Sequence, residues 1–287
     1  MAAPLAMTNL LARTIDATLE ALLSRGQRAR LARHLLNRAL GEGDGDPEKN
    51  GEYRVLAAIK KQWEIEGTTP TIFDVGANVG DWSFEAIRGL SPTARLFAFE
   101  PTSETFESLR DRLSSTPVSV TLQNFALGDA ESEAPLYVDT GSERAGTNSL
   151  HRRRAEVHFN LHQTTRGYVR VRKGDNVAYE AKVDRLHLLK IDTEGHEIAV
   201  LRGFQRMLAE QRVDFIQFEY GSAWADARTL LVDAFELLQA AGYQLAKLHP
   251  GGVVFVPQYD QRAETFAFCN YVAVRPELAR ALPVLND

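Results

Sequence analysis

The sequence predicts an α/β fold with a doubly wound, mostly parallel sheet, and three observations carry this prediction. Short apolar runs alternate with amphipathic helical segments between residues 71 and 275. The first run, 71–75, passes through a glycine loop directly into a helical segment. Polar side chains cluster just past the ends of several runs, where sheets of this kind bind their ligands.

The apolar runs give the expected order of strands and helices. Strands are expected at 71–75, 95–99, 118–124, 186–192 and 214–220. Helices are expected at 81–90, 103–113 and 225–241, and one more helix carries Ile198, Leu201, Phe204 and Leu208 on one face. Two further strands, near 243–248 and 270–275, close the sheet, and the final strand is expected to be antiparallel.

Two segments fall outside this alternation. Residues 1–50 predict a helical N-terminal extension, broken at Gly26, followed by a linker, and residues 51–287 form the main domain. The extension carries six arginines. It packs on the main domain or on a second subunit of a homo-oligomer, or it lies on a membrane surface. The second segment is an insertion at about 128–185, with short strands near 135–139 and 168–172, which is expected to face the substrate.

Composition describes an ordinary soluble chain and excludes several classes of protein. The 287 residues are 44% hydrophobic and 25% charged, which is enough for a sizeable core. A net charge of -5 argues against general nucleic-acid binding. Cys269 is the only cysteine, so no internal disulfide can form, and we expect a cytoplasmic location. No apolar run reaches the ~18–20 residues of a membrane span, and the N-terminus lacks a secretory signal pattern.

The loop after the first strand, D-V-G-A-N-V-G at 74–80, predicts a cofactor site. Gly76 and Gly80 allow a tight turn and the close approach of a ligand. Their spacing is G-x-x-x-G rather than the dinucleotide pattern G-x-G-x-x-G, and Asp74 beside them would repel a pyrophosphate. S-adenosylmethionine has no phosphate and carries an ammonium and a sulfonium, which suit this carboxylate. The alternative is a glycine turn of purely structural use.

Two further strand ends offer groups for the rest of that cofactor. Glu100 ends the second strand and can accept hydrogen bonds from both hydroxyls of a ribose. Asn124 and Phe125 follow the third strand and can hold an adenine by hydrogen bonding and packing. A solvated glutamate and a structural turn are the alternatives.

The richest polar cluster follows the fourth strand, in K-I-D-T-E-G-H-E at 190–197. Together with the end of the fifth strand it supplies the candidate catalytic residues, which are Lys190, Asp192, Glu194, His196 and Glu219. We expect His196 to act as a neutral general base, because a helix N-terminus disfavours its cationic form. Asp192 and Glu219 are the other candidates for the base, or the ligands of a divalent metal such as magnesium. An ion-paired helix cap is the structural alternative.

Taken together, the motifs resemble the FkbM family of S-adenosylmethionine-dependent methyltransferases. The resemblance rests on five stretches, in the order D-V-G-A-N-V-G-D-W-S, F-A-F-E-P, N-F-A-L-G-D, L-L-K-I-D-T-E-G-H-E-I-A-V-L-R-G and I-Q-F-E-Y. It covers about residues 70–275 and implies a Rossmann-like class I methyltransferase fold. It also implies O-methylation, in which a hydroxyl oxygen of a sugar, glycan or polyketide-type product attacks the sulfonium methyl in line.

The resemblance implies roles for individual residues. Those that map onto the cofactor side are Asp74, Gly76, Asn78, Gly80, Glu100 and Asn124. From the same stretches we add Ala77, Ser83 and Phe125 as cofactor-binding candidates. Those that map onto the segment facing the reaction are Asp192, Glu194 and His196.

A basic segment and two rival functions stay open. Residues 144–173 contain one acid, Glu156, and eight basic side chains, which are Arg144, Arg152, Arg153, Arg154, Arg166, Arg170, Arg172 and Lys173. They would steer an anionic acceptor to the site or form a solvated arm. The rival functions are a nicotinamide-dependent oxidoreductase and a non-catalytic binding module that keeps the cofactor fold.

Overall fold

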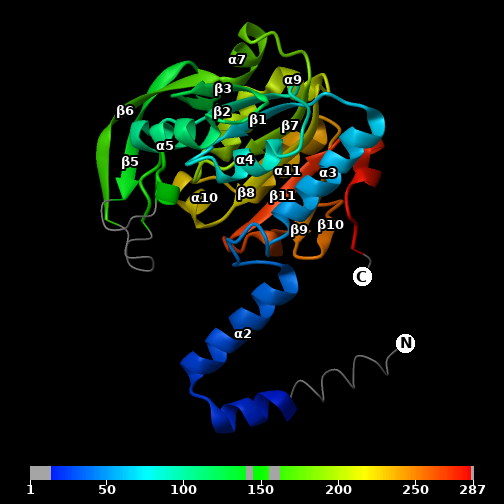
Figure 1. Cartoon of the computed structure of the whole chain (residues 1–287). Helices are drawn as coiled ribbons and strands as arrows, with labels where there is room; N and C mark the ends of the chain where they lie inside the picture. Colours follow the sequence, from blue (N-terminus) through cyan, green and yellow to red (C-terminus); the bar gives the residue numbers. More distant parts are fainter. Residues whose placement is uncertain (1–13, 140–144, 155–161, 286–287) are drawn as a thin grey trace. The chain divides into compact units, whose positions relative to one another are not determined.

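The chain divides into two compact units, Met1–Gly43 and Asp44–Asp287 (Figure 1). The computed structural model describes residues 14–139, 145–154 and 162–285. The division falls within the stretch 41–51, whose glycines, aspartates and proline resist regular structure.

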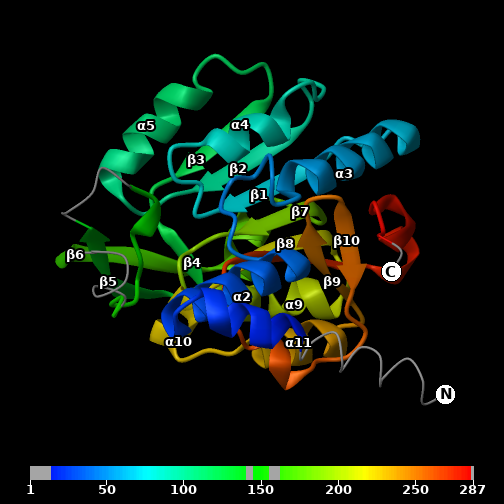
Figure 2. The same cartoon turned by 90° about the horizontal axis from the view of Figure 1, so that it is seen from below.

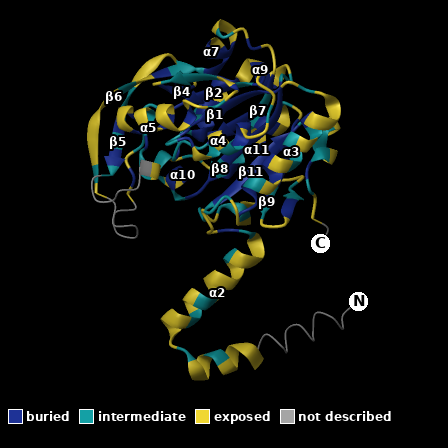
Figure 3. Ribbon diagram, viewed as in Figure 1, coloured by how far each residue is buried: buried dark blue, intermediate teal, exposed yellow. Residues whose placement is uncertain are grey.

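The described part of the first unit contains a helix at 14–22 and helix α2 (Arg25–Leu40). The predicted break at Gly26 is wrong by two residues, because Ser24 and Gln27 form a capping box that starts α2 at Arg25. Every residue of α2 is at least partly exposed (Figure 3). Within the described ranges no helix is both long and apolar enough to cross a membrane. Packing of this unit on a second subunit or on a membrane surface stays a prediction.

The described part of the second unit is built on an eight-stranded sheet in the order β10-β9-β11-β8-β7-β1-β2-β3. The parallel strands are β1 (Thr71–Val75), β2 (Arg95–Phe99), β3 (Ser119–Gln123), β7 (Leu186–Ile191) and β8 (Val213–Tyr220). They confirm the five predicted core strands to within one residue at each end. The last strand, β11 (Cys269–Val274), runs antiparallel to both neighbours, as expected.

The edge beyond β11 differs from the expectation. β9 (Gln244–His249) is confirmed within a residue, but β10 (Gly252–Phe255) was not predicted. It pairs with β9 in an antiparallel hairpin. Its four residues begin at a glycine with a positive φ of 157°, and so short a run is hard to recognise as a strand from sequence.

Helices cover both faces of the sheet (Figure 2). α3 (Glu52–Glu66), α4 (Asp81–Ile87) and α5 (Ser103–Leu113) lie on one face, and α8 (Glu197–Gly203), α9 (Gln205–Ala209) and α11 (Leu231–Ala240) lie on the other. Ile72 and Phe73 of β1 belong to the two different hydrophobic clusters, as alternate residues of a strand should. The doubly wound fold is therefore confirmed.

One helix was not predicted, and one predicted helix is divided in the structure. α3 was not predicted, although Val55, Leu56, Ile59 and Trp63 are buried at helical spacing. The single helix expected over 225–241 is two helices, α10 (Ser222–Ala227) and α11. Arg228 has a left-handed φ of 60° and ends α10, and Leu230 is extended where α11 is capped by Asp233.

The insertion forms a small second sheet in the order β4-β6-β5. β4 (Ala126–Gly128) is parallel to β6 (Gln163–Lys173), and β5 (Ser132–Asp139) is antiparallel to it. A short helix, α7 (Gly174–Glu180), then leads to β7. The two predicted short strands lie within β5 and β6.

Glycines allow this insertion to approach the main unit closely. A Cβ at Gly203 of α8 would overlap the carbonyl oxygen of Gly128 in β4 and would lie 3.2 Å from the backbone nitrogen of Gly174. Neither of these backbone groups can move as a flexible side chain would. The position therefore requires glycine.

We expect Gly203→Ala to lower the free energy of unfolding by about 2 kcal/mol, since an added methyl must push backbone apart. Urea unfolding with linear extrapolation measures the change. Gly45→Ala is the matched control, because a Cβ there meets nothing within 4 Å. Equal free energies of unfolding for Gly203→Ala and Gly45→Ala would contradict the close contact between α8 and the backbone of Gly128.

Candidate functional site

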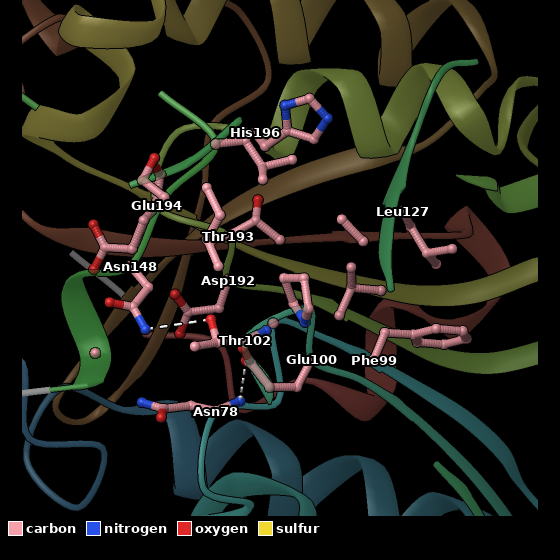
Figure 4. A pocket seen from close by; sticks show the side chains of 18 of the residues that line it. Asn78, Phe99, Glu100, Thr102, Leu127, Asn148, Asp192, Thr193, Glu194 and His196 are labelled. Carbon is pink, nitrogen blue, oxygen red and sulfur yellow. Dashed lines mark hydrogen bonds between the residues drawn. The ribbon is translucent and has the colours of Figure 1, made fainter. Parts of the chain in front are cut away.

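A cavity of about 250 Å³ lies at the carboxyl ends of β1, β2, β7 and β8 (Figure 4). The strand order reverses between β1 and β7, and doubly wound sheets bind ligands at such a point. The predicted site residues that line the cavity are Gly76, Asn78, Glu100, Asp192, Glu194, His196 and Glu219. They come from four separate motifs, which the parallel sheet brings to one edge.

The loop after β1 forms one side of the cavity. The N–H groups of Gly76 and Ala77 both donate to the carbonyl oxygen of Phe99, which ties the loop to β2. Gly76 has a φ of 82°, and a Cβ there would overlap the carbonyl oxygen of Asp192. Asn78 has a φ of 50°, and its buried Oδ1 has no hydrogen-bond partner among the described residues. The loop thus offers an unused acceptor to a ligand.

Glu100 presents a buried carboxylate between two backbone donors. Its Oε2 accepts from the N–H of Asn78 at 3.1 Å, and its Oε1 accepts from the N–H of Thr102 at 2.8 Å. Burial raises the pKa of Glu100, and these hydrogen bonds oppose the rise. Each carboxylate oxygen has a second lone pair, so the group can still accept from a ligand.

Lys190 forms an ion pair with Asp192. Its ammonium, 2% exposed, donates to Asp192 Oδ2 at 2.9 Å and lies 4.0 Å from Glu52 Oε2. Burial alone would lower the pKa of Lys190, but Asp192, Glu52 and Asp74 outweigh it and raise that pKa. Lys190 therefore stays cationic and stabilises the negative charge of Asp192.

Two further carboxyl groups of the wall have raised pKa values. Burial and the charge of Asp192 raise the pKa of Glu219 well above its ordinary value. Burial raises the pKa of Glu194 to about 7, although the Arg153 guanidinium that contacts it acts in the other direction. Asp192 and Glu219 lie side by side, because the register of β7 and β8 pairs Ile191 with Phe218.

His196 is neutral and turned from the centre of the cavity. Burial, with a smaller effect of His151, lowers the pKa of His196 to about 4. Its Nδ1 lies 3.1 Å from His151 Nε2, and its buried Nε2 has no partner among the described residues. A Cβ at Gly128 would lie 2.9 Å from that Nε2, so this nitrogen faces β4. Figure 4 shows the imidazole pointing away from Asp192 and Glu100.

The other predicted residues support the cavity without lining it. Asp74 accepts a 2.5 Å hydrogen bond from Ser83, and burial raises its pKa to about 6 against the effect of Lys190. Gly80 begins α4, where a Cβ would lie 2.7 Å from Leu109. Asn124 donates to the carbonyls of Glu100 and Pro101, and Phe125 packs in the core, 5.8 Å from Phe99 between ring centres.

The insertion contributes lining residues that the motifs did not reveal. They are Leu136, Gly146, Asn148, Ser149 and Leu150. Asn148 donates to Thr102, and Ser149 donates to the carbonyl of Glu194 at 2.7 Å. Arg153, 5% exposed, contacts Glu194, Ser222 and Asp226. The only signal was the position of the insertion between β3 and β7, which does not single out these residues.

Three of the seven described basic side chains of this segment are paired with acids. Arg153 contacts Glu194, Arg166 contacts Glu104, and Arg172 contacts Glu131 and Glu180. Arg170 lies over the ring of Phe125. Arg144 and Glu156 lie outside the described residues. The segment is thus only partly ion-paired where the structure describes it.

The described lining of the cavity is acidic. Its charged members are Glu100, Asp192, Glu194 and Glu219, and no lysine or arginine is found among the lining residues that the structure describes. Over the same described residues, no group of three or more His, Cys, Asp or Glu side chains is arranged to hold a metal ion. The cavity favours a cation over a phosphate.

Several known proteins are similar to this chain. It is 24% identical to the hexuronic acid methyltransferase AglP of Haloferax volcanii, over 64% of this chain and 69% of that protein. It is 29% identical to the AMB antimetabolite synthetase AmbE of Pseudomonas aeruginosa, over 74% of this chain but 11% of that protein. A precorrin-6y C5,15-methyltransferase structure from Geobacter metallireducens has a TM-score of 0.38 and 14% identity, covering 77% of this chain and 88% of that one. So low a TM-score carries no argument about this chain.

A family model decides the classification. The methyltransferase FkbM domain matches residues 74–245, from β1 to β9. The match covers more than half of the chain and includes the glycine loop, Glu100 and the 190–197 segment. The chain therefore belongs to the FkbM family of S-adenosylmethionine-dependent methyltransferases.

Proposed function

We propose that this chain transfers a methyl group from S-adenosylmethionine to a hydroxyl oxygen of a sugar or glycan. The observation that carries the proposal is the cavity with four carboxylates and no described lysine or arginine in its lining. Such a lining attracts the sulfonium and ammonium of the methyl donor and repels the pyrophosphate of a nicotinamide dinucleotide. The sugar acceptor is supported by the relative AglP, which is named a hexuronic acid methyltransferase.

The residues of the β1 and β2 ends fit the methyl donor. The carboxylate of Glu100 has lone pairs free for a pair of hydroxyls. The unpartnered Oδ1 of Asn78 is an acceptor for a donor group of the ligand. Gly76 keeps the loop free of a side chain where it meets the Asp192 carbonyl. S-adenosylmethionine, when bound, supplies a methyl carbon made electrophilic by its sulfonium.

In this proposal Asp192 accepts the proton of the acceptor hydroxyl. Asp192 lines the cavity, and the ammonium of Lys190 donates a hydrogen bond to its Oδ2. Glu219 beside it is neutral, and a neutral carboxylic acid can donate a hydrogen bond to the acceptor. General base catalysis contributes ~10²–10⁴-fold, and fixed orientation contributes up to ~7–11 kcal/mol.

His196 is less suited to the role of base than its position in the sequence suggests. Its Nε2 faces Gly128 and its Nδ1 is engaged with His151, so neither nitrogen is presented to the cavity. We propose that the two histidines pack together as a neutral pair.

The acidic lining also favours an uncharged acceptor group. A carboxylate acceptor would meet the carboxylate of Asp192, and no lysine or arginine is found among the described lining residues to neutralise it. Arg153, Arg166 and Arg172 of the insertion are paired with acids of the chain. We therefore propose methylation at a hydroxyl, giving an ether, rather than at a uronic carboxylate, giving an ester.

The test of the function uses the wild-type protein with S-adenosylmethionine and two sets of acceptors, methyl hexopyranosides and methyl hexopyranosiduronic acids. Mass spectrometry detects the methylated product. The product is expected to survive mild alkali, because an ether is stable where a methyl ester is hydrolysed. An alkali-labile product would show carboxyl methylation, and transfer to neither set would sink the sugar acceptor.

Glu100→Gln is expected to weaken binding of S-adenosylhomocysteine by about 10- to 100-fold, since hydrogen bonds to a charged group are worth ~1.5–3 kcal/mol. Isothermal titration calorimetry measures the dissociation constant. Glu104→Gln removes the same charge from an exposed position of α5 and should leave it unchanged. Equal affinities of the two variants would exclude Glu100 from the cofactor site.

Asp192→Asn is expected to lower kcat by ~10²–10⁴-fold, because it removes the proton acceptor. His196→Asn should lower kcat far less. Both variants are compared at equal saturation with the acceptor found above, with S-adenosylhomocysteine affinity measured separately. The reverse ranking, a severe loss in His196→Asn with Asp192→Asn near normal, would assign the base to His196.

A further inference from the structure

A buried carboxylate from outside the matched segment lies beneath this site. Glu52 is the first residue of α3, is 6% exposed, and precedes the FkbM match by more than twenty residues. Its Oε1 accepts from Asn50 at 2.8 Å and from Asn270 at 3.1 Å. Its Oε2 accepts from Gln217 at 2.7 Å. Asn50 just before α3, Gln217 of β8 and Asn270 of β11 thus fix this carboxylate in one place.

The same oxygen faces the ammonium that Asp192 shares. Lys190 Nζ lies 4.0 Å from Glu52 Oε2 and 2.9 Å from Asp192 Oδ2. The centre of the Trp82 ring is 5.8 Å away, and Asp74, which the register of β1 and β7 pairs with Lys190, also acts on its charge. The ammonium therefore lies between a carboxylate of the cavity wall and one held below it by three hydrogen bonds. Asp192 and Glu52 are the carboxylates that lie within 4.0 Å of it.

We infer that Glu52 is a positioning residue for methyl transfer. It is the second counter-charge of Lys190, and by holding that ammonium it orients the Asp192 carboxylate toward the acceptor. The inference rests on the proposed function, in which Asp192 accepts the acceptor's proton. Glu52 does not line the cavity and touches neither reactant.

A purely structural role for Glu52 makes a different prediction. Its hydrogen bonds to Asn50, Gln217 and Asn270 tie α3 to the sheet, and a glutamine of the same shape can keep several of them. The electrostatic role needs the negative charge. Because Gln217 is paired with Lys190 in the register of β7 and β8, a carboxylate at position 217 would face the same ammonium.

The test therefore removes the negative charge at residue 52 and then introduces a negative charge at residue 217. E52Q is expected to lower kcat about tenfold, the size of a typical coupling between buried neighbours, with KM for S-adenosylmethionine and S-adenosylhomocysteine affinity unchanged. The double swap E52Q/Q217E should restore most of the lost kcat. Glu48→Gln is the matched control, since it removes the same charge at an exposed position nearby.

The kcat values distinguish an electrostatic role of Glu52 from a purely structural one. The inference is overturned if E52Q folds and keeps the kcat of the wild type. It is also overturned if E52Q/Q217E folds and binds S-adenosylhomocysteine but keeps a low kcat. If E52Q is too unstable to purify, the kcat of E52Q/Q217E compared with that of the wild type is the deciding measurement. Melting temperatures of all variants identify a loss that is only structural.

A second arm needs no acceptor, so a failure of the proposed function is recognised separately. In protein carrying ¹⁵N-labelled lysine at neutral pH, the Nζ resonance of Lys190 reports how its ammonium is held, with Lys190→Met for assignment. E52Q should speed the exchange of the ammonium protons with water, because one of the two carboxylates close to the ammonium is gone, and E52Q/Q217E should slow it again. Unchanged exchange in E52Q overturns the inference even if no sugar is methylated. Faster exchange in a protein that methylates no sugar supports the inference and sinks the acceptor proposal.

Discussion

The ion pair between Lys190 and Asp192 is the interaction on which the rest of the site depends. A lysine that is 2% exposed must have an anion beside it, because an unpaired buried charge is strongly destabilising. That anion is Asp192, 2.9 Å away in the cavity wall. Glu194 lies in the same wall beside the Arg153 guanidinium, and Glu219 has no ion pair among the described residues. Burial raises the pKa values of both. The three neighbouring carboxyl groups of the wall therefore have different electrostatic surroundings.

The sheet brings these groups together through a close approach of two strand ends. The register of β1 and β7 pairs Asp74 with Lys190, and the N–H of Asp192 donates to the carbonyl of Val75. Gly76 follows immediately, and its missing side chain leaves room for the Asp192 carbonyl. The cofactor loop and the reacting segment are therefore neighbours across one strand pair.

The strands and half of the site could be predicted from the sequence because both depend on local patterns. Five apolar runs became the parallel strands, and the polar residues after them, such as Glu100 and Asp192, line the cavity. Contacts between distant segments could not be predicted in this way. Glu52 meets Gln217 from 165 residues away, and Ser149 meets Glu194 through an insertion that has no motif. The imidazole of His196 turns toward Gly128 for the same reason, since β4 arrives from another part of the chain.

Helix α3 is part of the folded methyltransferase domain, although it precedes the segment that matches the family. The recognisable family segment starts at residue 74, but Val55, Leu56, Ile59 and Trp63 of α3 complete the hydrophobic cluster on one face of the sheet. The same helix begins with the second anion of Lys190. A fragment cut at the family boundary would expose that apolar face and leave a buried lysine with one fewer partner. The minimal catalytic unit therefore begins before Asn50, whose side chain holds Glu52 in place.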